Sequence, residues 1–257
     1  MNDIYIACLL GLLQGFTEFL PVSSSAHLIL LPKLMGWQDF GLPFDIAIHM
    51  GSLLAIIGYF FKDRVFKPDF RVLLLVVIAT IPVGLCGLIF KHFIQNNLRS
   101  INLIAITTVV FGILLGVSYW YNNYKKQDFN AEQLSIKDAI LIGCAQAIAL
   151  IPGVSRSGIT LTAGLFLGFR SSVAARFSFL LAIPVIALAG GLQSLELIRE
   201  HGMAIPMCSI LVSGFLSSLI SSFIFVFLFL KFIHKIGMWP FVIYRILLGS
   251  MLWLNFN

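Results

Sequence analysis

Apolar and polar positions alternate along this chain in long blocks, and the apolar blocks fall into two length classes. The longer class approaches the roughly 20 residues that a helix needs to cross a bilayer. Its six members form two groups of three: residues 44–61, 72–90 and 101–121, then 179–198, 205–230 and 240–256. We expect each of the six to be a transmembrane helix.

A pair of shorter apolar runs, interrupted by polar residues, precedes each group. The first pair occupies residues 4–16 and 28–31, and the second occupies 136–151 and 159–169. Runs of this length do not span a bilayer, and irregular backbone at membrane depth is tolerated only where it lines a cavity or is buried in protein. We therefore expect two re-entrant helix-turn-helix elements with polar tips.

The same order of elements occurs twice, and short motifs support a repeat. Gly11-Leu-Leu-Gln14 matches Gly143-Cys-Ala-Gln146, and Pro21-Val-Ser-Ser-Ser matches Pro152-Gly-Val-Ser-Arg-Ser. Chance similarity between apolar segments is the alternative. Because three spans per copy is an odd number, the copies must have opposite orientation, which places the site at the repeat interface.

The expected fold is an all-α polytopic membrane protein with one integral membrane domain over residues 1–257. It is an inverted repeat of residues 1–124 and 134–257, and each copy is a re-entrant helix pair plus three transmembrane helices. Composition agrees, because hydrophobic residues make up 59% of the chain and charged residues only 11%. No soluble core needs that much apolar surface.

Charge indicates orientation rather than a nucleic-acid partner. The net charge of +6 is best explained by basic loops at 62–71, 125–137 and 231–235, which we expect to be cytoplasmic. Both termini then face outward, and the first broken pair enters from the outside. The four cysteines lie in apolar runs without Cys-x-x-Cys spacing, so we expect neither a disulfide framework nor a zinc site.

The motif Pro152-Gly-Val-Ser-Arg-Ser-Gly-Ile-Thr160 carries the clearest chemistry. A loop that leads into a helix N-terminus offers N–H groups and a positive dipole end, which suit a phosphate. Arg156 adds a planar fork of donors, and the hydroxyls of Ser155, Ser157 and Thr160 flank it. The alternative is a polar turn in which Arg156 extends to the membrane interface.

A second set of polar residues surrounds the first broken pair. Gln14 and Glu18 are four residues apart, so they share a helix face and are candidate ligands of a divalent cation, Mg²⁺ or Ca²⁺. A structural hydrogen-bonded pair is the alternative. His27 is a candidate general acid, general base or nucleophile, and the run that begins with Ser23 and Ser24 supplies candidate nucleophiles or phosphate donors.

Three further residues are weaker candidates. Asp45 and His49 are again four apart at the start of a span, where they would orient His27 or the cation, or simply lie at the interface. Arg176 occupies the repeat position of His49 and is a candidate partner for a carboxylate. If the two tips meet, a carboxylate, a hydroxyl, an imidazole and a guanidinium share one pocket, which suffices for phosphoryl transfer.

These motifs resemble those of the undecaprenyl-diphosphate phosphatase family, the bacitracin-resistance family of bacterial inner membranes. The resemblance rests on Gln14-Gly-Phe-Thr-Glu18-Phe-Leu-Pro-Val-Ser-Ser-Ser-Ala-His27, on Pro152–Thr160 and on Phe44-Asp-Ile-Ala-Ile-His-Met-Gly-Ser-Leu-Leu-Ala55. Length and hydropathy agree along essentially the whole chain. The chain departs from the family at Gln14, where many members have glutamate, at Ala26, where glycine is common, and at Ile159, where a smaller residue is usual.

The resemblance implies hydrolysis of undecaprenyl diphosphate to the monophosphate, which recycles the lipid carrier of cell-wall synthesis. It implies a divalent cation, a membrane-lipid environment, an inverted-repeat fold with re-entrant helices and a pocket that opens to the periplasmic side of the plasma membrane. Gln14 and Glu18 fall on its acidic motif, Ser24 and His27 on its catalytic pair, and Arg156 on its phosphate arginine. Whether Ser24 or His27 attacks stays open, as does the oligomeric state, a homodimer included.

Other functions are also compatible with parts of the pattern. Inverted repeats with broken helices are typical of transporters, so a polyprenyl-phosphate flippase is the main alternative. An intramembrane serine hydrolase would use Ser24 and His27 but would not explain Arg156. The lipid phosphatases with Ser-Gly-His and Ser-Arg motifs have a different order and spacing, so any likeness to them would be convergent.

Overall fold

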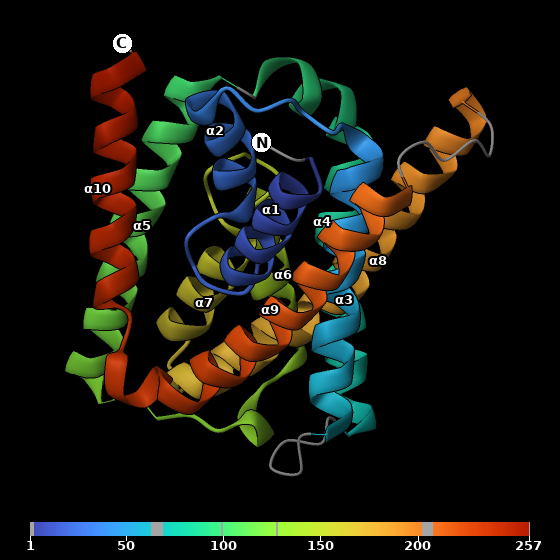
Figure 1. Cartoon of the computed structure of the whole chain (residues 1–257). Coiled ribbons are helices and arrows are strands. Elements are labelled where there is room, and N and C mark those ends of the chain that lie inside the picture. Colours follow the sequence, from blue (N-terminus) through green and yellow to red (C-terminus); the bar gives the residue numbers. More distant parts are fainter. Residues whose placement is uncertain (1–2, 63–68, 99, 127, 202–207, 257) are drawn as a thin grey trace. The chain divides into compact units, whose positions relative to one another are not determined.

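A computed structural model describes residues 3–62, 69–98, 100–126, 128–201 and 208–256. Within these residues every named element is a helix, and one isolated β-bridge joins Phe129 to Phe169 (Figure 1). The elements are α1 Asp3–Thr17, α2 Ser24–Met35, α3 Leu42–Lys62, α4 Phe70–Asn97, α5 Ile101–Lys125, the short 3₁₀ helix η1 Ala131–Gln133, α6 Ile136–Ile148, α7 Arg156–Phe166, α8 Ser171–His201, α9 Cys208–Ile236 and α10 Trp239–Phe256.

In the described part of the chain, five of these helices could span a membrane. They are α3, α4, α5, α8 and α9, each long and apolar enough to cross a bilayer. The expected all-helical polytopic class is therefore confirmed. The segment expected as a sixth span coincides with α10, which has 18 residues and is not one of the five. Six spans stay a prediction.

Both predicted broken pairs are interrupted at their polar motifs. Helix α1 ends at Thr17 and α2 begins at Ser24, while α6 ends at Ile148 and α7 begins at Arg156. The four helices have 15, 12, 13 and 11 residues. The end of α6 and the start of α7 each lie three residues earlier than the apolar runs suggested. Helices this short place polar loops in the middle of apolar sequence, which is the feature the candidate site depends on.

The chain forms two compact units whose residues interleave along the sequence. Unit 1 comprises residues 1–19, 27–67 and 182–228, and unit 2 comprises 20–26, 68–181 and 229–257. The segment 20–26, which contains the end of the loop after α1 and the first three residues of α2, therefore belongs to unit 2, although the residues on both sides of it belong to unit 1. Its hydrogen bonds, described below, explain this assignment.

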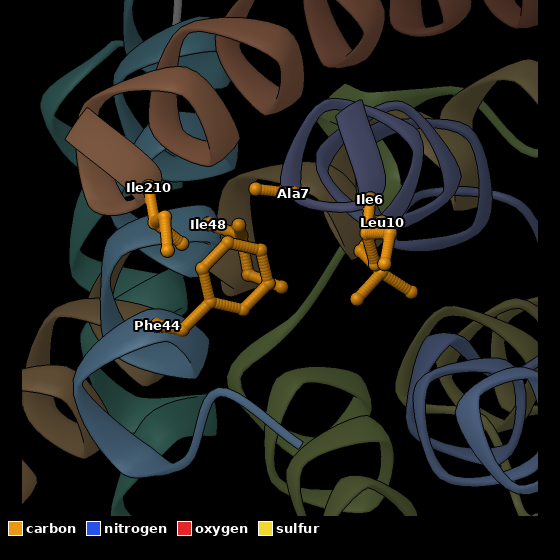
Figure 2. Close-up of a cluster of buried hydrophobic side chains, with 6 residues drawn as sticks. All are labelled: Ile6, Ala7, Leu10, Phe44, Ile48 and Ile210. Carbon is orange, nitrogen blue, oxygen red and sulfur yellow. The ribbon is translucent and has the colours of Figure 1, made fainter. Parts of the chain in front are cut away.

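Unit 1 has an apolar core built from α1, α3 and α9. Figure 2 shows this cluster, in which Phe44, Ile48 and Ile210 gather beside Ala7, and Ile6 and Leu10 extend from the same helix α1. A polar seam joins α3 to α9 deeper in the unit, where the Ser52 hydroxyl is 2.9 Å from that of Ser218. Small side chains of this kind allow helices to approach closely in an apolar environment.

Unit 2 is organised around α5, α7 and α10. Helix α5 packs against both α7 and α10, and α6 packs against both α4 and α7 (Figure 1). A glycine in α5, Gly112, faces the side chain of Arg245 on α10, and a Cβ there would lie 2.8 Å from the arginine Cβ. This close approach brings a buried guanidinium to the loop between α6 and α7.

Candidate functional site

Two polar loops with the same local geometry precede α2 and α7. Ser23 has a φ of 73° and Ser155 a φ of 71°, and each residue immediately precedes its helix. In each loop the serine hydroxyl lies 3.3 Å from the hydroxyl two residues later, Ser25 in one and Ser157 in the other. The two loops are the ones that the sequence repeat pairs with each other.

A positive φ is unfavourable for serine, because its Cβ crowds the backbone in that region. Such residues cost about 1–3 kcal/mol each and persist only where the surroundings hold them. Unit 2 supplies those surroundings: the buried Ser157 hydroxyl donates a 2.8 Å hydrogen bond to the Leu20 carbonyl. The loop before α2 and the loop before α7 are thus hydrogen-bonded to each other within one unit.

Arg156 is the first residue of α7 and is half-buried. Its Nη1 donates to the Ser178 carbonyl of α8 at 3.1 Å, which orients the guanidinium. The preceding Ser155 caps α7 by accepting a hydrogen bond from the Gly158 N–H at 3.1 Å. A guanidinium and the positive end of a helix dipole therefore lie together, an arrangement that attracts an anion.

Thr160 lies one turn into α7, and its hydroxyl is engaged inside unit 2. It donates to the Arg156 carbonyl at 2.9 Å and lies 2.7 Å from the Ser178 hydroxyl. Thr160 and Ser178 are both 1% exposed. The pair therefore ties α7 to α8 beneath Arg156. Sequence reasoning missed Ser178, because a serine in an apolar helix resembles the many packing serines of this chain.

In unit 1 the structure brings together Gln14, Glu18 and His49. The Gln14 Nε2 donates to Glu18 Oε2 at 3.1 Å, as expected for residues four apart, because Glu18 directly follows α1 and its N–H still donates to the Gln14 carbonyl at 2.9 Å. His49 Nε2, from α3, is 3.9 Å from the same carboxylate oxygen. His49 Nδ1 is 2.7 Å from the Asp45 carbonyl, and because a carbonyl only accepts, Nδ1 must carry a hydrogen. Nε2 is then the nitrogen that faces Glu18.

The Gln14 and Glu18 pair fits a hard divalent cation. With its amide nitrogen committed to Glu18, Gln14 leaves Oε1 buried, and among the described residues this oxygen has no hydrogen-bond partner. An amide oxygen beside a carboxylate is a suitable ligand set for Mg²⁺ or Ca²⁺. The described residues contain no group of three or more His, Cys, Asp and Glu positioned for a metal. Such a cation would therefore take further oxygen ligands from water or from a substrate.

The remaining predicted residues lie as follows. Ser24 and His27 are three residues apart on α2 and partly buried, so they share one face of that helix. Asp45 is exposed near the start of α3 and contributes its carbonyl to His49. Arg176 is partly buried on α8, in unit 2. By unit, Gln14, Glu18, His27, Asp45 and His49 belong to unit 1, and Ser23, Ser24, Ser155, Arg156, Ser157, Thr160 and Arg176 to unit 2.

Arg245 is the residue that sequence reasoning should have found and did not. It is the only charged residue between 239 and 257, within an otherwise apolar segment. An ionisable residue in such a segment is a functional candidate by default. The structure shows that its side chain is fully buried and donates hydrogen bonds to carbonyls of both polar loops.

Comparison with known proteins places these features in a family. The family model described as "Bacitracin resistance protein BacA" matches residues 7–251. Similar proteins include "Undecaprenyl-diphosphatase 2" of Stutzerimonas stutzeri (strain A1501), 47% identical over 99% of both chains. They also include the "Undecaprenyl-diphosphatase" proteins of Saccharophagus degradans, 48% identical over 96% of both chains, and of Campylobacter concisus, 49% identical over 97% of this chain and 98% of the relative. This chain belongs to the bacitracin resistance protein BacA family.

Proposed function

We infer that this chain hydrolyses undecaprenyl diphosphate to undecaprenyl phosphate and inorganic phosphate, which recycles the lipid carrier of cell-wall synthesis and confers bacitracin resistance. The observation that carries the inference is the near-full-length similarity to proteins named undecaprenyl-diphosphatase. The chemistry of the residues agrees, because unit 2 holds an arginine at a capped helix N-terminus, which suits a diphosphate.

In the proposed reaction Arg156 binds the diphosphate through its planar fork and stabilises the charge that develops during transfer. Ser155 supplies its hydroxyl or N–H group to phosphate oxygens, and Ser23 does the same from the paired loop. Ser157 supplies its N–H group, because its hydroxyl donates to the Leu20 carbonyl. Thr160 supports Arg156 through the Arg156 carbonyl and Ser178. We assign Arg176 a weaker supporting role, as a further positive charge of unit 2.

Gln14 and Glu18 would hold the divalent cation, supported by the buried Gln14 Oε1 and the adjacent carboxylate. The cation would supply positive charge to the transferred phosphoryl group. The Asp45 carbonyl would orient His49, which places Nε2 beside Glu18, 3.9 Å from Oε2. Second partners of this kind raise the precision with which a ligand is held.

The nucleophile is either Ser24 or His27, and either choice gives a complete reaction. If His27 attacks the terminal phosphorus, the bond to the bridging oxygen breaks, undecaprenyl phosphate leaves, and water then hydrolyses the phosphohistidine. If Ser24 attacks, His27 accepts its proton, and water later releases phosphate from the phosphoserine. The three-residue spacing on α2 supports either version, since it places both side chains on one helix face.

The finer architecture is part of the proposal. We place the chain in the bacterial plasma (inner) membrane with six spans, α10 being the sixth, and with the site opening to the periplasmic side. The basic loops on the opposite side support this orientation. The matching φ values of Ser23 and Ser155 and their matching hydroxyl pairs support the inverted repeat. A homodimer is compatible with the proposal but not required by it.

The test is phosphate release from a C55 or C15 prenyl diphosphate by purified protein in detergent, with Mg²⁺ or with EDTA. We expect release from the wild type, strong inhibition by EDTA and loss of release in His27→Ala. His92→Ala, which changes an exposed histidine on α4, is the matched control and should behave as wild type. Folded protein that releases no phosphate would contradict the hydrolase. It would favour the flippase instead, because a detergent solution has no sides between which lipid can move.

A further inference from the structure

Arg245 donates four hydrogen bonds, and every acceptor is a backbone carbonyl. Nε donates to Thr108 of α5 at 3.1 Å, and Nη1 donates to Pro21 at 3.2 Å. Nη2 donates to Gly153 at 2.9 Å and to Val154 at 3.0 Å. The side chain is 0% exposed. One guanidinium therefore joins α5, the loop before α2 and the loop before α7, all within unit 2.

The direction of these carbonyls determines where the loop's N–H groups point. The described chain has no cis peptide bond, and in a trans peptide the N–H points opposite to the preceding C=O. Because the Gly153 and Val154 carbonyls face Arg245, the N–H groups of Val154 and Ser155 face the other way. The Val154 N–H donates to the Ile151 carbonyl at 3.3 Å, so the Ser155 N–H is the one that the turn presents at the start of α7, where N–H groups attract anions.

Helix α5 reinforces the same orientation. The Thr107 hydroxyl donates to the Pro152 carbonyl at 2.7 Å, and the Thr108 hydroxyl donates to the Gly153 carbonyl at 3.4 Å. Gly153, with a φ of 89°, is pressed so closely to α5 that a Cβ would lie 2.7 Å from the Ile104 carbonyl. The carbonyls of residues 152–154 thus all accept hydrogen bonds from α5 or from Arg245.

We propose that Arg245 is a positioning residue for the reaction inferred above: by binding the carbonyls of both polar loops, it turns the Ser155 N–H, immediately before α7, toward the diphosphate. The proposal rests on the proposed function. It gives Arg245 no contact with the substrate. It also explains a lone arginine in α10, since four carbonyl dipoles compensate a buried charge that would otherwise be very unfavourable.

The direct test is Arg245→Lys, because an ammonium keeps the charge but cannot reach three separate segments as the guanidinium fork does. We expect kcat for a C15 prenyl diphosphate to fall about 100-fold, the effect of misplacing groups by about 1 Å. The melting temperature in detergent should show that the protein is folded. A kcat within twofold of wild type would overturn the proposal.

A second variant disturbs Arg245 without replacing it. Gly112→Ala places a Cβ 2.8 Å from the arginine Cβ and 3.4 Å from Nε. Gly116→Ala is one turn further along α5, and the side chains nearest to its Cβ are Val242 and Trp239 of α10. We expect kcat to fall about tenfold in Gly112→Ala and to stay within twofold of wild type in Gly116→Ala. Equal effects in the two variants would show helix packing only and would contradict the positioning role.

A readout that does not depend on activity separates this proposal from the proposed function. Inorganic pyrophosphate, a probe for the diphosphate group, should raise the melting temperature of the wild type and of Gly116→Ala but not of Gly112→Ala. If the wild type binds pyrophosphate in this way but releases no phosphate from lipid, the hydrolase is contradicted and the role of Arg245 survives. If Gly112→Ala retains the full shift, the role of Arg245 is contradicted.

Discussion

The loop before α2 and the loop before α7 have a similar backbone conformation but carry different side chains. Each has a serine with a φ near 72° at the start of its helix and a hydroxyl pair at 3.3 Å. The residue after that serine is Ser24 in the first loop and Arg156 in the second. Three residues further along, His27 in the first loop corresponds to Ile159 in the second.

The helices that precede the loops differ in the same way. Gln14 of α1 is followed four residues later by Glu18, while its counterpart Gln146 of α6 is followed by Leu150. The first segment therefore holds the acid, the imidazole and the candidate cation ligands, and the second segment holds the arginine. The comparison teaches that one loop geometry can carry quite different side chains, and in the proposed function those few side chains decide what each loop does.

The largest expected effect comes from removing the arginine that distinguishes the second loop. Arg156→Ala should lower kcat/KM by about 1,000-fold or more, because it removes the fork that stabilises the transferred phosphoryl group. Arg156→Lys should not restore activity, since it lacks bidentate geometry. Steady-state phosphate release measures both. Arg170→Ala, which breaks an exposed ion pair with Asp128, is the control and should keep wild-type turnover. Near-normal turnover in Arg156→Ala would remove Arg156 from the site.

The next effect tests the acid of the first copy against its apolar counterpart. Glu18→Ala should lower activity by about 10- to 100-fold, and raising the Mg²⁺ concentration should recover part of it, because the cation site loses its carboxylate. Leu150→Ala, at the position just after α6 that the sequence match pairs with Glu18, should leave the Mg²⁺ dependence unchanged. A Mg²⁺ titration of phosphate release compares the two. The same titration curve for Glu18→Ala and wild type would exclude Glu18 as a cation ligand.

A smaller effect should distinguish the two hydroxyl pairs. Ser157 is buried and donates to the Leu20 carbonyl, whereas Ser25 is exposed. Ser157→Ala leaves a buried carbonyl without that donor, which costs about 1–3 kcal/mol, and should lower the melting temperature in detergent by several degrees. Ser25→Ala should change it by less. Equal melting temperatures would mean that the Ser157 bond does not hold the two loops together.

The smallest expected effect concerns the two glutamines: replacing Gln146 should change stability, and replacing Gln14 should change activity. Both amide atoms of Gln146 are buried and, among the described residues, have no hydrogen-bond partner. Gln146→Leu should therefore raise stability by about 1 kcal/mol with activity unchanged, while Gln14→Leu should reduce activity and weaken the response to Mg²⁺. Melting curves and phosphate release test both. A loss of activity in Gln146→Leu would show that the second copy also uses its amide.

Much of this arrangement could be predicted from sequence, because it depends on residues close together in the chain. The lengths of apolar runs predicted the helix class and the breaks near residues 20 and 152, and the four-residue spacing predicted the contact between Gln14 and Glu18. The motif Pro-Gly-Val-Ser followed by helix-forming residues predicted that Arg156 lies at a helix N-terminus.

The remaining contacts were not predictable from one sequence. Arg245 donates only to backbone carbonyls, and every residue type supplies that acceptor, so the sequence contains no partner pattern to find. The contact between His49 and Glu18 depends on how α1 packs against α3, which apolar periodicity does not specify. The assignment of residues 20–26 to unit 2 depends on bonds to residues 157 and 245, far along the chain.

The bond between Pro21 and Arg245 joins residues 224 positions apart. The ribosome makes the loop before α2 early and its anchoring side chain almost last. The loops at residues 18–23 and 149–155 therefore reach their final arrangement only after synthesis of α10 begins, when most of the chain has already been made. A chain that stops before Arg245 can build most of its helices and the bond between Ser157 and Leu20, yet it lacks the guanidinium that binds carbonyls of both loops at once.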